Sequence, residues 1–303
     1  MPIHDVHCHF FSRRFFETLA QGMKDPAPGD PARSLPARLG WEAPGTPEEL
    51  ADRWIAELDR HGVGRAALMA SVPGDEVSVA AAVARHPRRF VGFFMLDPTR
   101  QDAAERAGRA LSEQRLRSVC LFPAMHRYAI QDERAMKIFE IAAAHPGSAV
   151  FVHCGVLTVG VRMKLGLPSR FDIRFGNPLD VHAVALTFPQ VPIIIPHFGA
   201  GLFREALMVA DLCPNILLDT SSSNSWTKYH SGLTLHDAFR QALEVAGPDR
   251  LLFGTDSSFF PRGWQAAVYH AQRAALQELR AAPDTMEKLF HANFDRVFPA
   301  ESP

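Results

Sequence analysis

Eight short, nearly continuous apolar runs recur along the chain, at residues 3–9, 66–72, 90–96, 118–123, 149–155, 192–199, 216–222 and 251–256. Each run is followed by a segment whose apolar residues have helical spacing, such as Leu50, Trp54 and Leu58 after the first. Strands that are buried on both faces read as unbroken apolar runs, and their alternation with helices indicates parallel pairing. Eight such units predict an α/β fold, a (β/α)8 barrel that forms one domain over residues 1–303. The alternation alone also allows a doubly wound open sheet.

Two segments interrupt this alternation. Residues 24–48 contain six prolines, so we expect no regular structure there, after a short helix at about residues 14–23. Residues 156–176 carry four basic residues among glycines and a proline. These insertions follow the first and fifth strands at the ends where barrel enzymes build their pockets, so we expect lids or substrate walls. A surface flap or a contact between the copies of a homodimer is the alternative.

The composition narrows the class of protein. The chain has 303 residues, 47% hydrophobic and 21% charged, which is typical of a soluble protein with a packed core. Its 32 basic and 33 acidic residues give a net charge of −1, which argues against a nucleic-acid partner, and no apolar run is long enough to span a membrane. A small-molecule substrate is the expected partner. Four scattered cysteines without a C-x-x-C pair, and an N-terminus without an apolar leader, favour the cytoplasm.

Polar residues stand where four of the apolar runs end. The first run ends Asp5-Val6-His7-Cys8-His9, and strand alternation places His7 and His9 on the same face. The fifth run ends at His153, the sixth at His197 and the eighth at Asp256. These ends meet at the rim where barrel active sites form, so we expect a metal site there. For any single position, a hydrogen bond to a neighbouring loop is the alternative.

The residue types indicate which metal and which neighbours to expect. Histidine nitrogens and a carboxylate suit one Zn²⁺ best, with Mn²⁺, Fe²⁺ or Co²⁺ as alternatives. Cys8 and Cys154 are each adjacent to a histidine on a strand, so they should face the helices and belong to the core. Asp5 shares the alternation of His7 and His9 but lies deeper, so we expect it to hydrogen-bond rather than to coordinate.

Taken together, the motifs D-x-H-x-H, V-H-C-G, I-P-H-F-G and F-G-T-D resemble those of the amidohydrolase superfamily over residues 3–298. The closer resemblance is to the amidohydrolase-related branch that includes aminocarboxymuconate-semialdehyde decarboxylase. It implies that His7, His9, His153 and Asp256 ligate one metal, and that His197 stands beside the metal-bound water as an acid/base or polarising group. Binuclear members carry a lysine or glutamate on the fourth strand, whereas residues 118–123 read SVCLFP, which implies a single metal. We expect Cys120 to be a core residue rather than a bridging ligand.

Such a site lowers the pKa of bound water to about 7, which favours hydrolysis of an ester, lactone or amide, with Asp256 and His197 as the catalytic residues. Non-oxidative decarboxylation of an aromatic or unsaturated acid is the alternative, and a non-catalytic metal-containing barrel is a third reading. Phenylalanines near the strand ends favour an apolar or aromatic substrate with a carboxylate, although ordinary packing also explains them. The residues that we expect to contact it are Arg262, Arg204, Trp226 and His126. The alternative for each arginine is a surface salt bridge or a helix-end position, and for His126 an ordinary loop position.

Overall fold

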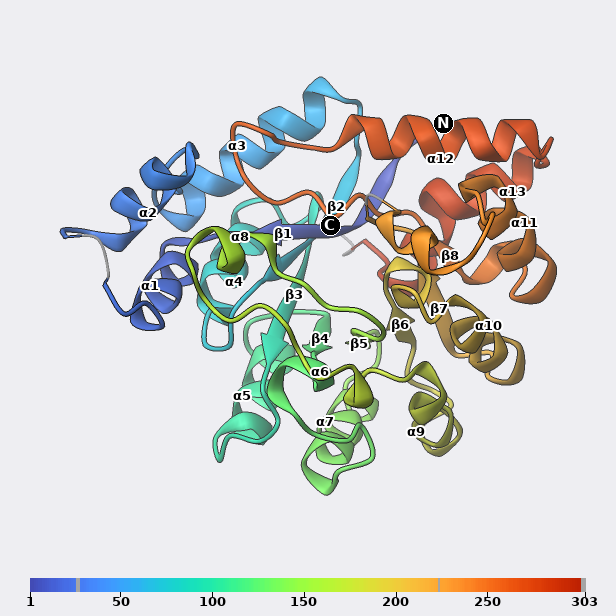
Figure 1. Ribbon diagram of the computed structural model, residues 1–303, viewed down its shortest axis with the longest axis horizontal. Helices are drawn as coiled ribbons and strands as arrows, with labels where there is room; N and C mark the ends of the chain where they lie inside the picture. The colour runs from blue at the N-terminus through green and yellow to red at the C-terminus, as the bar shows by residue number, and fades with distance from the viewer. Residues whose placement is uncertain (26–27, 223, 301–303) are drawn as a thin grey trace.

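A computed structural model describes residues 1–25, 28–222 and 224–300, so Pro26 of the first insertion and the last three residues of the predicted domain lie outside the described part. Eight parallel strands pair in the order of the sequence, which confirms the predicted barrel (Figure 1). The strands are β1 (His4–Phe10), β2 (Arg65–Ala70), β3 (Phe90–Leu96), β4 (Ser118–Leu121), β5 (Ala149–Val152), β6 (Ile193–Ile195), β7 (Ile216–Asp219) and β8 (Leu251–Leu252).

The barrel closes through the residues that follow β8. The amide of Val6 donates to the carbonyl of Phe253 at 2.9 Å, and the amide of His9 donates to the carbonyl of Ser257 at 2.7 Å. Cys8 and Ser257 form a parallel bridge between them. The segment that carries Asp256 is therefore hydrogen-bonded directly to the segment that carries His7 and His9.

Helices surround the strands and follow most of them (Figure 1). The α-helices are α1 (Arg13–Gln21), α2 (Pro31–Leu39), α3 (Pro47–Arg60), α4 (Glu76–Arg85), α5 (Ala103–Ser112), α6 (Pro123–His126), α7 (Glu133–Ala143), α8 (Gly160–Lys164), α9 (Val181–Thr187), α10 (Phe203–Leu212), α11 (Leu235–Val245), α12 (Ala266–Glu278), α13 (Pro283–Glu287) and α14 (Asn293–Val297). Among the described residues, no helix combines the length and apolar character that crossing a membrane requires.

The apolar residues form three clusters. One fills the barrel and includes Val6, Met69 and Phe93, and a larger one lies between the strands and the helices. Cys8 and Cys154 belong to the larger cluster, as predicted, and Cys120 is buried inside the barrel. The third cluster joins the segments that follow β1 and β5, because Phe16 of α1 and Leu35 of α2 pack with Val161 of α8. The segments after β1 and β5 thus share a small core of their own.

The expectation that residues 24–48 lack regular structure is wrong for 31–39, which form α2. Pro31 stands at the start of the helix, where its missing N–H has no intrahelical partner to lose. The Asp30 carboxylate accepts from the amide of Ala32, and Gly40 ends the helix in the left-handed conformation. A proline in this segment therefore begins a helix, and Pro36 lies within the same helix without ending it.

Candidate active site

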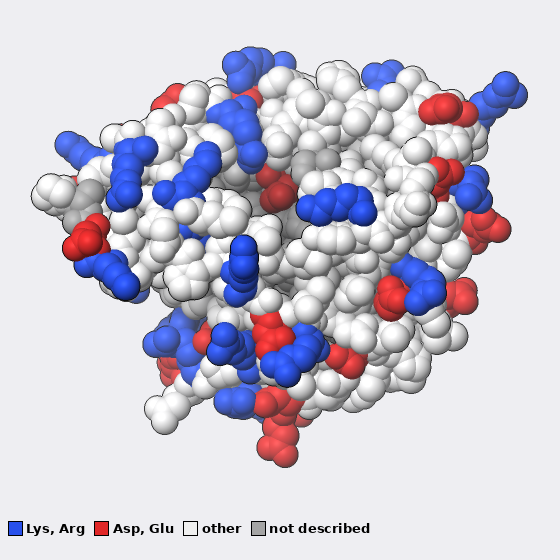
Figure 2. Space-filling model, in the orientation of Figure 1, with Lys and Arg blue, Asp and Glu red and all other residues white. Residues whose placement is uncertain are grey.

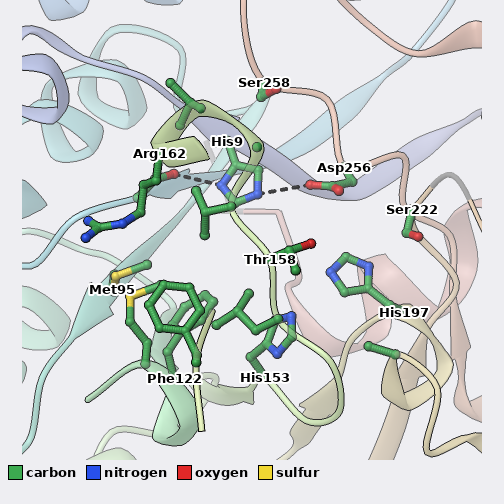
Figure 3. Close-up of a pocket in the computed structure, with 18 of the residues that line it drawn as sticks. His9, Met95, Phe122, His153, Thr158, Arg162, His197, Ser222, Asp256 and Ser258 are labelled. Carbon is green, nitrogen blue, oxygen red and sulfur yellow. Dashed lines mark hydrogen bonds and ion pairs between the residues drawn. The ribbon is translucent and has the colours of Figure 1, made fainter. Parts of the chain in front are cut away.

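The structure brings His7, His9 and Asp256 together at the carboxyl end of the barrel. Figure 3 shows His9 beside Asp256. Asp256 Oδ1 lies 3.0 Å from His9 Nε2 and 3.7 Å from His7 Nε2. One ligand atom from each residue lies within 4.8 Å of the other two. Two imidazole nitrogens and a carboxylate oxygen at this spacing suit a divalent transition metal.

A bulge in β1 changes the arrangement that simple alternation predicts. The pairing with β2 shifts between Asp5 and Cys8, so Val6 packs inside the barrel while Asp5 lies in the outer layer. The inference that Asp5 lies on the face of His7 and His9 is therefore wrong. Its carboxylate does hydrogen-bond rather than join the metal cluster, as predicted, accepting from the amides of His7 and Thr255 and from the indole N–H of Trp264. Burial raises the pKa of Asp5 to about 6.

Two further residues orient the histidines of the cluster. Asp219, at the end of β7, is fully buried, and its Oδ2 lies 2.7 Å from His7 Nδ1. Ser71, which follows β2, places its hydroxyl 2.7 Å from His9 Nδ1. Each contact uses Nδ1 and leaves Nε2 facing Asp256, which is how a second layer of groups fixes the orientation of a metal-binding imidazole. The sequence analysis missed both residues, although an aspartate that ends the apolar run Ile216-Leu217-Leu218 was a usable signal.

His153 and His197 line the same cavity from β5 and β6, and Figure 3 shows both rings pointing into it. Their ring centroids are 5.4 Å apart, and the His197 ring stacks 5.0 Å from that of His7. His153 is not part of the His7–His9–Asp256 group, but its Nδ1 is buried without a hydrogen-bond partner among the described residues. A buried polar atom without a partner beside this donor set fits a metal ion close to it.

The surroundings of the site shift the pKa values of its titratable groups in different directions. Burial lowers the pKa of His153 and of His197, and in each case a neighbouring histidine lowers it further. Burial opposes the charged form of His7 too, but the carboxylates of Asp219, Asp256 and Asp5 together outweigh burial and raise the pKa of His7. Burial likewise opposes the charge of Asp256, yet the hydrogen bond from His9 and the nearby histidines hold its pKa below the usual range. These shifts favour an ionised Asp256 beside a neutral His197.

Two glycines make room for this arrangement. A Cβ on Gly254 would lie 2.6 Å from Asp219 Oδ1 and 3.1 Å from the Cβ of His7. Gly155 has φ +77°, and a Cβ there would collide with the backbone carbonyls of Gly199 and Ala200. The glycines of the F-G-T-D and V-H-C-G motifs therefore let the strand ends approach one another.

A cavity of about 810 Å³ opens above the cluster, and both insertions contribute to its walls. Four basic side chains line it, and in Figure 2 lysines and arginines surround a hollow in this face of the molecule. Within the described part of the chain, Asp256 is the one acidic residue of the lining. The basic residues are Arg162, Lys164, Lys228 and Arg262.

Three of the four predicted substrate-binding residues line this cavity, namely Arg262, Trp226 and His126. Arg262 donates to the hydroxyl of Ser258 at 2.6 Å. His126 Nδ1 and Trp226 Nε1 are buried without hydrogen-bond partners among the described residues. Arg204 is not in the lining: its side chain is 81% exposed and donates to Glu205.

Stacked aromatic rings form one wall of the cavity. The rings of Trp41 and Phe259 lie 3.9 Å apart and nearly parallel, and the guanidinium of Arg262 lies 4.5 Å from the centre of the Phe259 ring. The ammonium of Lys164 lies 5.9 Å from the centre of the Trp41 ring. Trp41 was not among the predicted site residues, because it lies in the first insertion and far from any strand end.

A parallel barrel that gathers histidines and an aspartate at its carboxyl end is the arrangement of a metal-dependent barrel enzyme. The chain belongs to the amidohydrolase family, whose model matches residues 4–300. Among curated proteins, 115 residues are 26% identical to protein fluG of Emericella nidulans, a match that covers 38% of this chain and 12% of fluG. The chain thus matches only a small part of that relative's length.

Solved structures share the fold at low sequence identity. A 5-carboxyvanillate decarboxylase from Novosphingobium aromaticivorans, with bound manganese and a substituted benzoic acid, has a TM-score of 0.65 and 16% identity, covering 98% of this chain and 97% of that one. A probable 2-pyrone-4,6-dicarboxylic acid hydrolase from Acinetobacter baumannii has a TM-score of 0.61 and 14% identity, over 98% and 99% of the chains. An amidohydrolase from Burkholderia multivorans with bound zinc has a TM-score of 0.60 and 15% identity, over 99% and 100%.

Proposed function

We propose that this protein is a metal-dependent hydrolase that cleaves an ester, lactone or amide bond in a small, anionic, apolar or aromatic substrate. The observation that carries the proposal is the His7–His9–Asp256 cluster at the base of a cavity with a basic lining. His7, His9, His153 and Asp256 would hold one metal ion, with zinc as the first choice. A divalent cation supplies a Lewis acid that polarises a substrate oxygen and makes water acidic enough to ionise near neutral pH.

The residues of the chain supply the proton transfers. Asp256 is positioned to accept a proton from the attacking water, because its carboxylate is ionised and faces the cavity. His197, neutral and lining the same cavity, is positioned to hydrogen-bond the water or the oxygen that becomes negative as the bond is attacked. These two side chains perform the roles of base and polarising group.

The walls of the cavity support the choice of substrate. Four basic side chains against one acidic residue favour a substrate with at least one carboxylate, and Arg262 is the anchor closest in sequence to Asp256. The stack formed by Trp41 and Phe259 gives an apolar, planar surface beside that anchor. We propose a small molecule as the partner. The free, buried cysteines support a reducing compartment such as the cytoplasm.

Decarboxylation of an aromatic acid is the second candidate. The aromatic wall beside Arg262 favours it, and a 5-carboxyvanillate decarboxylase has the same fold. In that reaction a proton reaches the carbon that bears the carboxylate, and carbon dioxide leaves. The two reactions differ in whether an oxygen atom of water enters the product.

An isotope experiment tests the proposal. Zinc-loaded and manganese-loaded protein is incubated in H₂¹⁸O with carboxylated aromatic esters, lactones and amides and with carboxylated phenols, and products are analysed by mass spectrometry. Hydrolysis places one ¹⁸O atom in the new acid and releases no carbon dioxide. If the substrate releases carbon dioxide and the remaining organic product contains no ¹⁸O, the result would favour the second candidate. Turnover of no compound by either loaded form would favour a non-catalytic barrel. Asp256→Asn is the control for a contaminating hydrolase.

A further inference from the structure

Ser221, two residues beyond the end of β7, lies among the polar groups behind the site. Its hydroxyl oxygen is 2.9 Å from His197 Nδ1, 3.0 Å from His7 Nδ1 and 3.0 Å from Asp219 Oδ2. Ser221 is fully buried, so it faces these groups rather than solvent. One hydroxyl therefore contacts a residue of the metal cluster, its carboxylate partner and the proposed proton-handling histidine.

The directions of these hydrogen bonds follow from what each atom can do. Asp219 Oδ2 can only accept, and it lies 2.7 Å from His7 Nδ1, so that nitrogen carries a proton. A protonated Nδ1 of His7 cannot accept the hydroxyl proton of Ser221. The hydroxyl therefore donates to Asp219 Oδ2, where the acceptor is a carboxylate.

A hydroxyl that donates to Asp219 presents its lone pairs to His197. The backbone carbonyl of Ser221, which can only accept, lies 3.3 Å from the same nitrogen of His197. Both contacts favour a proton on Nδ1. Since the hydrogen bonds from the described residues to this ring all go to Nδ1, the unprotonated Nε2 is left for the cavity that His197 lines (Figure 3).

We propose that Ser221 is a positioning residue that holds His197 as the tautomer with its proton on Nδ1, so that Nε2 is the atom that accepts a proton or a hydrogen bond during the reaction. The kinetic consequence rests on the proposed function, whereas the tautomer does not. Without the hydroxyl, His197 keeps only the longer contact to the carbonyl, and the two tautomers become closer in free energy. A group that orients another in this way typically changes rates by about 10- to 100-fold.

The test is ¹⁵N NMR of histidine-labelled protein, both metal-free and zinc-loaded, with the His197 signals assigned by their loss in His197→Asn. We expect a protonated Nδ1 and an unprotonated Nε2 in the wild type, and signals shifted toward a mixture of tautomers in Ser221→Ala. On any substrate found in the isotope experiment, Ser221→Ala should lower kcat about 10-fold or more with KM, zinc content and melting temperature near those of the wild type. The matched control is Ser118→Ala, which changes a buried serine of β4 whose hydroxyl, unlike that of Ser221, has no hydrogen-bond partner among the described residues.

Three results would overturn the proposal. They are a proton on Nε2 of His197 in the wild type, a Ser221→Ala spectrum identical to that of the wild type, and a Ser221→Ala protein in which only the melting temperature falls. If the wild type shows the proton on Nδ1 and Ser221→Ala shows a mixture of tautomers, while neither protein turns over any compound, the result would support the tautomer assignment and contradict the proposed function. The NMR spectra therefore test the tautomer of His197, and the turnover measurements test the proposed function independently.

Discussion

His197 lines the cavity, and its proposed role is to handle a proton without binding the metal. Asparagine in its place retains a group that can hydrogen-bond Ser221 but cannot take up a proton. We therefore expect His197→Asn to keep the metal content and melting temperature of the wild type while kcat falls by about 10²–10⁴. Turnover, elemental analysis and thermal unfolding on one preparation check this. Loss of the metal would make His197 a ligand, and unchanged turnover would leave it without a role.

Arg262 and Arg204 test the substrate's charge, because sequence analysis predicted the same role for both and the structure separates them. Arg262 lines the cavity beside Asp256, whereas Arg204 is exposed on α10. Loss of a charge-assisted hydrogen bond costs about 1.5–3 kcal/mol, so Arg262→Ala should lower kcat/KM for the carboxylated substrate about 10- to 100-fold. Arg204→Ala should stay within about twofold of the wild type. Equal effects of the two substitutions would argue against the basic lining as the anchor.

At the scale of elements, the predictable part was the strands, because burial on both faces leaves an unbroken apolar signature in the sequence. The bulge in β1 was not predictable, since an extra residue changes the register without changing the pattern of residue types. The helix α2 was hidden by its prolines, of which Pro31 stands in the first turn, where proline is tolerated, and Pro36 lies inside the helix. Local pattern therefore located the strands, while the pairing of distant segments decided how their side chains point.

The junction between α1 and α4 carries a prediction about pH. Asp75, the N-cap of α4, is buried and accepts from the hydroxyl of Ser12, the N-cap of α1. Burial raises its pKa from 3.8 to about 6, with Glu76 also raising it and Arg14 lowering it. The folded protein therefore binds a proton that the unfolded chain releases, so this contribution to stability is full below pH 4 and disappears as the pH rises through 6.

Asp75→Asn keeps an acceptor for Ser12 but does not titrate. Relative to this variant, the wild type should lose about 2 kcal/mol of unfolding free energy between pH 4 and pH 7. Urea denaturation of both proteins across this range measures the difference, and the buried Asp5, whose pKa is also about 6, cancels in the comparison. Parallel stability curves would show that Asp75 has the same pKa in the folded and unfolded states.

For the whole molecule, the strand-end histidines and Asp256 were visible in the sequence because a parallel barrel gathers its strand ends at one rim. Asp219 was not, since its contact with His7 joins residues 212 positions apart and depends on closure of the barrel between β7, β8 and β1. The face that Arg204 presents depends on where α10 packs, which spacing does not determine. The residues at the strand ends that face the cavity could thus be predicted, whereas Asp219, which orients His7 from behind, could not.

The metal content of the purified protein decides whether His7, His9 and Asp256 form a metal site. After reconstitution with zinc and removal of excess metal, elemental analysis should find about one metal ion per chain in the wild type. His7→Ala and Asp256→Ala should each lower the occupancy, because each removes a donor from the cluster, whereas His236→Ala, which changes a histidine of α11, should not. Two tightly held ions per chain, no retained metal, or full occupancy in both cluster variants would contradict the account.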